Sequence, residues 1–173
     1  MEKTKIDSSL LDIMLEEEAW KNISRAGNLS ESLLEKYRGK LDWEAVTTNS
    51  SIHWTPSMLE RFRHQIDWQQ LSSYAEAELL VPEVVERFKD YWNWDALSEN
   101  SNLPLETVER FPDRVNWSHI INRYSNENDR FTRAFLEKWA DRIPAEKFKD
   151  STLFYDLVLE KEKELIRRMF AED

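Results

Sequence analysis

The chain has 173 residues and a formal net charge of −10, with 40% hydrophobic and 34% charged residues. This balance is typical of a folded, soluble domain and argues against disorder throughout. Two glycines leave little room for glycine-rich phosphate loops, and the absence of cysteine excludes disulfides and thiolate metal sites.

The N-terminus reads MEKTKIDSSLLDIMLEEE, and its apolar run is too short and too acidic for a signal peptide. No stretch of the sequence has the length needed to span a bilayer. A chain without cysteine also fits a reducing compartment. We therefore expect a cytoplasmic protein that does not enter a membrane, and a monomer.

A pattern of about 25 residues recurs along the chain. Its clearest position, which we call the anchor, is a tryptophan in five copies and an alanine in the sixth: Trp20, Trp43, Trp68, Trp94, Trp117 and Ala145. The anchors are 23, 25, 26, 23 and 28 residues apart. The six predicted copies span residues 6–26, 29–49, 54–74, 80–100, 103–123 and 131–149.

Apolar side chains stand at fixed distances from the anchor. Nine residues before it are Leu11, Leu34, Leu59, Val85, Val108 and Leu136. Six residues before it are Met14, Tyr37, Phe62, Phe88, Phe111 and Trp139. Three residues after it are Ile23, Val46, Leu71, Leu97, Ile120 and Phe148. This spacing predicts that each copy buries one apolar stripe of a first helix and one of a second helix.

Helix start signals precede both predicted helices. The first helix follows an N-cap residue in four copies: Asp7, Ser30, Thr55 and Thr132. Proline takes its first position at Pro56 and Pro82. The second helix follows an aspartate or asparagine directly before the anchor: Asp42, Asp67, Asn93 and Asn116. Asn49 and Asn100 lie where a residue that tolerates the left-handed conformation can end this helix.

One copy is too small to bury its apolar stripes alone, whereas stacked copies can. We therefore predict an all-α fold, a right-handed α/α solenoid of about six helix-turn-helix units of ~25 residues, in a single domain over residues 1–173. Glu16, Glu17 and Glu18 precede the anchor of the first copy, as a solvent-facing end would require. A longer helix over residues 151–170 is expected to cap the last copy.

Three second-helix segments, DWEAVTTN, DWQQLSSY and NWDALSEN, follow first helices such as MLERF and VVERF. They resemble the tandem DWxxLSxN repeats of uncharacterised bacterial and viral proteins, over residues 29–123 well and over the ends loosely. The resemblance implies an α-solenoid and carries no activity or binding residues with it. Tetratricopeptide repeats are a more distant likeness, because their period is about 34 residues and their small-residue contacts are absent.

Motifs for catalysis are missing: the sequence has no GxSxG, P-loop, HExxH or glycine-rich dinucleotide loop. The three histidines, His53, His64 and His119, stand at different positions of different copies and have no ligand partner at helical spacing. We therefore expect neither an enzyme nor a metal or other cofactor. A hydrolase using an acid pair such as Glu76 and Glu78 is a third hypothesis, behind two binding functions.

Charge is unevenly distributed along the chain. Residues 74–109 carry nine acidic and two basic side chains, whereas residues 110–149 have a net charge of +3. The basic stretch 110–133 could contact phosphates, but the acidity of the rest argues against direct nucleic-acid binding. The acidic segment is either a solvated surface or a surface for a basic partner.

Aromatic residues and a histidine occupy a few positions outside the shared core pattern, and they are either interface anchors or ordinary surface residues. We slightly favour the second interpretation. Together with acidic neighbours they give the candidate partner-binding residues Tyr74, Glu76, Glu78, Glu83, Tyr91, Asp95, Glu99, His119 and Tyr124.

The sequence thus predicts a non-catalytic protein–protein interaction module, a helical-repeat scaffold whose acidic segment meets another protein with a basic surface. The alternative is a small acidic inhibitor or immunity-type protein that occludes a basic partner surface, such as one that binds nucleic acid. In both cases the partner is a protein, not a membrane or a nucleic acid.

Overall fold

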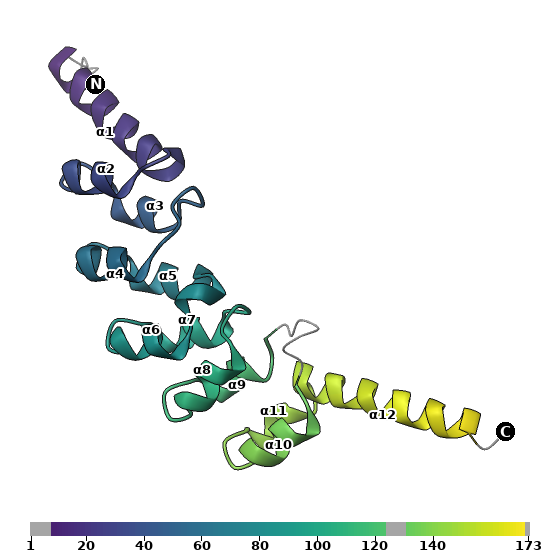
Figure 1. Ribbon diagram of the computed structural model, residues 1–173. Coiled ribbons are helices and arrows are strands. Elements are labelled where there is room, and N and C mark those ends of the chain that lie inside the picture. Colours follow the sequence, from purple (N-terminus) through teal and green to yellow (C-terminus); the bar gives the residue numbers. More distant parts are fainter. Residues whose placement is uncertain (1–7, 124–130, 172–173) are drawn as a thin grey trace, which may run out of the picture. The chain divides into compact units, whose positions relative to one another are not determined.

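The computed structural model describes residues 8–123 and 131–171 (Figure 1). Within these two ranges every regular element is a helix and no strand occurs. The all-α prediction is therefore confirmed. The chain divides into two compact units, Met1–Tyr74 and Ala75–Asp173, which we call the first and the second unit.

The first unit contains one long helix followed by short ones: α1 (Ser8–Ala26), α2 (Glu31–Lys36), α3 (Trp43–Thr47), α4 (Pro56–Phe62) and α5 (Trp68–Tyr74). Helix α3, a second helix in the predicted pattern, packs against both α1 and α5. The anchor-bearing helices of successive copies therefore lie against one another in this unit.

The second unit contains a 3-10 turn, short helices and a long final helix: η1 (Ala77–Leu79), α6 (Pro82–Arg87), α7 (Trp94–Glu99), α8 (Leu105–Arg110), α9 (Trp117–Ile120), α10 (Arg133–Trp139), α11 (Ala145–Phe148) and α12 (Thr152–Ala171). First helix α6 packs against first helix α8, and second helix α7 packs against second helix α9. First and second helices thus form separate layers over α6–α9.

The helix starts agree with the sequence signals. Predicted N-cap side chains accept a hydrogen bond from the amide three residues ahead at Ser30, Asp42, Thr55, Asp67, Asn93 and Thr132. Such a bond stabilises a helix by about 1 kcal/mol because it satisfies an amide that the helix leaves unpaired. Asp7, the predicted cap of the first copy, lies outside the described residues.

The repeated apolar positions form the core of both units. Nine residues before the anchor, the buried side chains are Leu34, Leu59, Val85 and Val108. Three residues after it, they are Val46, Leu71, Leu97 and Ile120. Six residues before it, Phe62, Phe88 and Phe111 are buried. Removing these side chains from water is the main stabilising contribution to such thin layers.

Each tryptophan anchor from Trp43 onward closes the link between the two helices of its copy. The indole N–H donates to the carbonyl oxygen five residues earlier, at 2.8–2.9 Å, in Trp43, Trp68, Trp94 and Trp117. At Trp43, Trp94 and Trp117 the ring also meets an aromatic side chain of the next copy, with centroids 5.2 Å apart for Trp43 and Phe62. The same contact joins Trp94 to Phe111 at 5.4 Å. One side chain thus holds its own copy together and packs against the next.

The first copy differs from this pattern. Its residues form the single continuous helix α1, with Trp20 inside the helix instead of at the start of a second one. Leu11, Met14 and Ile23, at positions that are buried in other copies, are 44%, 51% and 41% exposed. The segment before Trp20 consists of glutamates and alanine, which favour helix, and it has no capping residue to interrupt one. The expectation of a buried stripe in this copy was wrong.

Helix α12 begins where the sequence predicted, since the Ser151 hydroxyl accepts a hydrogen bond from the amide of Phe154 at 3.2 Å. The amide of Leu153 donates to the carbonyl of Ile121 at 3.0 Å, which docks the first turn on the end of α9. The last turns are exposed at Leu165, Ile166, Met169 and Phe170. The prediction of a covering helix therefore holds for its first half only. Among the described helices, none has the length and apolarity to cross a membrane.

Candidate partner-binding surface

The predicted partner-binding residues fall in different places. Tyr74 is the last residue of α5 in the first unit and is 70% exposed. Tyr124 lies outside the described residues. The others belong to the second unit: Glu76, Glu78, Glu83, Tyr91, Asp95, Glu99 and His119.

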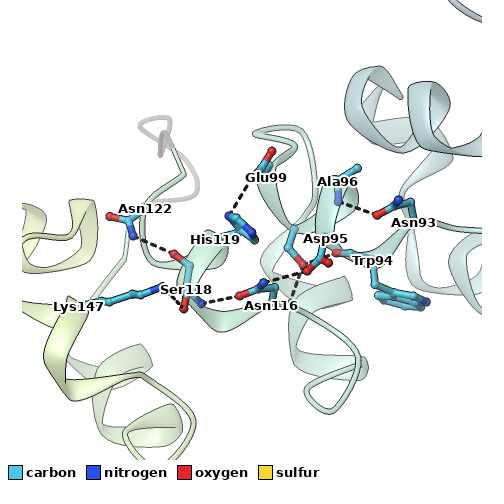
Figure 2. A network of polar contacts seen from close by, with 11 residues as sticks. Asn93, Trp94, Asp95, Ala96, Glu99, Asn116, Ser118, His119, Asn122 and Lys147 are labelled. Carbon is cyan, nitrogen blue, oxygen red and sulfur yellow. Dashed lines mark hydrogen bonds and ion pairs between the residues drawn. The ribbon is translucent and has the colours of Figure 1, made fainter.

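Three of these side chains connect the second helices α7 and α9 (Figure 2). Nδ1 of His119 lies 2.9 Å from Oε1 of Glu99. The side-chain amide of Asn116 donates to Oδ1 of Asp95 at 2.8 Å. These groups are already engaged with a neighbouring copy of the same chain, so they are less suited to a partner than the sequence suggested.

Further bonds extend this arrangement along the second helices. The backbone amide of Asn116 donates to Oγ of Ser98 at 2.9 Å, and Ser98 donates in turn to the carbonyl of Trp94 at 2.6 Å. Lys147 of α11 donates to Oγ of Ser118 at 3.2 Å, as Figure 2 shows. We call this set the second-helix row: Asp95, Glu99, Asn116, Ser118, His119 and Lys147. Its contacts join α7, α9 and α11.

Ser98→Ala is expected to lower the free energy of unfolding by about 1–3 kcal/mol, because it leaves the amide of Asn116 without this acceptor. Ser98 is fully buried, so water cannot replace the lost hydroxyl. Urea unfolding followed by circular dichroism measures the change. The matched control is Ser101→Ala at an exposed serine, for which we expect a change below about 0.5 kcal/mol. Equal stability of the two variants would contradict the hydrogen bond assigned between Ser98 and the amide of Asn116.

Three predicted carboxylates lie outside the second-helix row. Glu76 and Glu78 stand at η1, Glu83 stands in the first turn of α6, and all three are exposed. Their carboxylates have no hydrogen bond or ion pair with the rest of the described chain. We call Glu76, Glu78 and Glu83 the α6-edge carboxylates. Glu106 occupies the position in the next copy that Glu83 occupies in its own. It stands in the first turn of α8, which packs against α6, and its carboxylate likewise has no partner among the described residues.

Other acidic side chains of the segment 74–109 are neutralised locally. The ion pairs are Glu86–Lys89 at 2.8 Å, Asp90–Arg114 at 3.3 Å and Glu109–Lys138 at 3.0 Å. The hydrogen bond from Lys89 lowers the pKa of Glu86 below its ordinary value, so this carboxylate stays ionised beside its partner. Within the segment 74–109, the α6-edge carboxylates and Glu106 are therefore the acids without a side-chain partner, whereas Asp95 keeps its charge beside the neutral amide of Asn116.

Tyr91 stands three residues before its anchor and is 36% exposed. In other copies the side chain at this position reaches the copy before it: Lys40 to Glu16 at 2.9 Å, Arg114 to Asp90 at 3.3 Å and Arg142 to Asp113 at 2.5 Å. The hydrogen bond from Lys40 also lowers the pKa of Glu16. This position joins copies elsewhere in the chain, which weakens the case for Tyr91 as a partner anchor.

The side chains of Asn49 and Asn100 bind backbone carbonyls, a role that the sequence did not predict. No described non-glycine residue has a positive φ, so the left-handed helix ends expected at Asn49 and Asn100 were wrong. Instead, the buried side-chain amide of Asn49 donates to the carbonyls of Ser24 at 3.0 Å and Gly27 at 2.9 Å. Asn100 donates likewise to the carbonyl of Ala75 at 3.0 Å. The only sign of these bonds in the sequence is that an asparagine stands six residues after the anchor in two copies.

No group of three or more potential metal ligands gathers in residues 8–123 or 131–171. The chain matches no family model, and neither a curated protein nor a solved structure is significantly similar to it. Its function has to be inferred from the geometry and charge of its own side chains.

Proposed function

We propose that this chain is a non-catalytic helical-repeat module that binds a basic surface of another protein through the α6-edge carboxylates. One observation carries the proposal: Glu76, Glu78 and Glu83 are exposed and unmatched, whereas neighbouring acids are paired. Unmatched charges of one sign speed and orient the encounter with an oppositely charged surface. A paired acid contributes little to this, because its field is cancelled at short range.

The scaffold of the proposal is the right-handed α/α solenoid of about six units that the ~25-residue repeat pattern predicts. A contact that recurs within the units supports it. The buried hydroxyl four residues after one anchor accepts from the amide just before the next: Ser24 from Asp42 at 3.0 Å, Thr47 from Asp67 at 3.1 Å and Ser98 from Asn116 at 2.9 Å. A constant contact of this kind favours a constant stacking geometry within each unit.

The acidic-inhibitor alternative receives less support from the same charges. Imitating the phosphates of a nucleic acid requires an extended array of unmatched negative groups. Asp95 and Glu99 are engaged in the second-helix row, and Asp90 is paired with Arg114. The carboxylates of the segment that have no side-chain partner are thus few and lie near the starts of α6 and α8.

Reversal of the α6-edge charges, in the variant Glu76→Lys/Glu78→Lys/Glu83→Lys, is expected to weaken partner binding at least about tenfold and to flatten its salt dependence. Proteins that immobilised wild-type chain retains from an extract of the source cells are identified by mass spectrometry. The retained partner is then purified and titrated calorimetrically against both chains at low and high salt.

A matched control carries the same change of charge at exposed acids elsewhere, Glu44→Lys/Glu146→Lys/Asp150→Lys. These carboxylates also have no side-chain partner among the described residues. Their reversal should leave the affinity within about twofold of wild type. Equal losses in both variants would mean that net charge, not a docking surface, governs binding. Wild-type affinity in the α6-edge variant would overturn the proposal.

A further inference from the structure

Leu33 of α2 is more exposed than the residues at its position in later copies. It stands ten residues before its anchor and is 37% exposed. The later residues at this position, Met58, Thr107 and Phe135, are 6%, 0% and 6% exposed. Thr107 shows what this position meets, because its hydroxyl donates to the carbonyl of Leu80 at 2.5 Å, next to the start of the first helix of the preceding copy. Leu33 therefore lies where a first helix of the first copy would pack.

Lys36 of α2 also lacks the partner that its position has in other copies. It stands seven residues before its anchor, as Arg61 and Lys138 do in theirs. These two cations pair with an acid of the preceding copy, Arg61 with Glu31 at 3.1 Å and Lys138 with Glu109 at 3.0 Å. The ammonium group of Lys36 has no acidic partner among the described residues.

The side chains that could supply both contacts are exposed in the N-terminal half of α1. Leu11 and Met14, at positions that form the core of later copies, are 44% and 51% exposed. Asp12 stands eight residues before its anchor, the position from which Glu109 reaches Lys138. Its carboxylate has no bond to any other part of the chain that the structure describes. Apolar side chains and an acid on α1 thus match an uncovered leucine and an unpaired lysine on α2.

From Glu16 onward, the first copy already makes the contacts of later copies. Trp20 meets Tyr37 of the next copy, with ring centroids 5.2 Å apart, and Glu16 lies 2.9 Å from Lys40. What differs is the direction of residues 8–15, which continue α1 as one straight helix (Figure 1). A turn just before Trp20 would direct these residues toward α2, as the link between the two helices does in other copies.

We propose that residues 8–15, which we call the strap, fold back as a separate helix onto α2 of the same chain through a turn over residues 15–19. In this closed form the apolar side chains of the strap cover Leu33, and Asp12 pairs with Lys36. The strap of the same chain has the advantage over that of a second copy, because the rest of α1 already holds it near α2 and gives it a high effective concentration. The α6-edge carboxylates take no part in this change.

Two residues of the turn segment favour the straight, open form. Later copies have a buried apolar residue two positions before the anchor, such as Leu41 and Ile66, where the first copy has Glu18. Directly before the anchor, Ala19 replaces the aspartate or asparagine that caps a second helix. The strap therefore has two forms, in which the burial of apolar side chains opposes a missing cap and a charged residue in the turn.

Cross-linking between two introduced cysteines tests the closed form. The chain has no cysteine, so Ser8→Cys/Ser32→Cys, at two exposed serines, carries the only thiols. In the closed form they lie on neighbouring helices about 10 Å apart, within reach of a short bismaleimide. The straight form places Ser8 about 18 Å before Trp20 along α1. Mass spectrometry of a mixture of isotopically labelled and unlabelled chains separates links within a chain from links between chains.

The cysteine variant is expected to cross-link within the chain. Adding Leu11→Gln/Met14→Gln should slow this reaction at least about fivefold, because the strap then loses its apolar contact with α2. Adding Glu18→Leu/Ala19→Asp should speed it at least about threefold, because the turn then has the apolar residue and the cap of later copies.

A matched control for the turn, Glu17→Leu/Asn22→Asp, makes the same change of charge and apolarity at neighbouring exposed positions. It should leave the rate within about twofold of the cysteine variant. All the substituted residues are exposed, so each variant should fold, which circular dichroism verifies.

Four results would overturn the proposal. Links between chains would mean that a second copy covers α2. A rate that Leu11→Gln/Met14→Gln leaves unchanged would mean that the strap does not bind through its apolar side chains. Links that form only with Glu18→Leu/Ala19→Asp would mean that the natural α1 stays straight, and the absence of links in every variant would mean that no closed form exists.

Discussion

Phe62→Ala is expected to lower the free energy of unfolding by about 4 kcal/mol, a large fraction of the stability of a small domain. The Phe62 side chain is completely buried, and its ring lies 5.2 Å from that of Trp43. Truncation removes this contact and leaves a cavity between two copies, because the surrounding backbone relaxes only partly. Urea unfolding followed by circular dichroism measures the loss.

Two further variants of the first unit separate packing from simple loss of an aromatic ring. Tyr74→Ala removes a ring that is 70% exposed and should change stability by less than about 0.5 kcal/mol. Phe62→Leu keeps most of the volume and should cost less than about 1.5 kcal/mol. A loss in Phe62→Ala no greater than that in Tyr74→Ala would contradict the core position of Phe62.

Asn49→Ala is expected to cost about 3 kcal/mol, because one buried side chain satisfies three backbone groups. Its amide donates to the carbonyls of Ser24 and Gly27, and its Oδ1 accepts from the amide of Ser51 at 2.9 Å. Alanine leaves all three groups without these bonds. The matched control is Asn28→Ala, at an exposed asparagine of the same unit, with an expected change below about 0.5 kcal/mol.

Asn49→Asp separates the donor from the acceptor. At neutral pH the carboxylate keeps the acceptor for Ser51 but turns a negative charge toward two carbonyl oxygens, so it should destabilise at least as much as alanine. Protonation restores a donor, and the deficit relative to wild type should therefore shrink as the pH is lowered. A deficit that is constant between about pH 3 and pH 8 would contradict the hydrogen bonds assigned to Asn49.

The features that the sequence predicted well depend on residues close together in the chain. Ser30 caps α2 through the amide of Leu33, and Asp42 caps α3 through that of Ala45, so a few residues decide each helix start. The buried stripes follow equally directly, since Leu34 and Val46 hold their positions by helical periodicity. Repetition strengthens such predictions because each copy tests the same pattern.

Features that depend on the neighbouring copy were not predictable in the same way. Asn49 has a side chain suited to a left-handed helix end, but its partners are carbonyls more than 20 residues earlier. The continuous helix α1 and the exposed end of α12 likewise depend on what packs against them, which composition does not specify.

The candidate surface illustrates the same limit. Counting acids over residues 74–109 identified a region of negative charge, but it did not separate paired from unpaired carboxylates. Asp95 and Glu99 are bound across copies, whereas Glu76 and Glu83 are not, and the difference lies in whether Asn116 and His119 come within reach. The sequence gives only the total number of charged residues in a segment, whereas recognition of a partner depends on which of them have no partner within the chain.

The indole bond also determines where the chain accepts a change of length. In four copies the tryptophan N–H binds the carbonyl five residues earlier, although successive anchors are 23 to 28 residues apart. An insertion between Arg38 and Trp43 would displace that carbonyl from the indole. The segments that follow Asn49 and Asn100 already differ in length between copies. Insertions and deletions are therefore best placed there, at the junctions between copies.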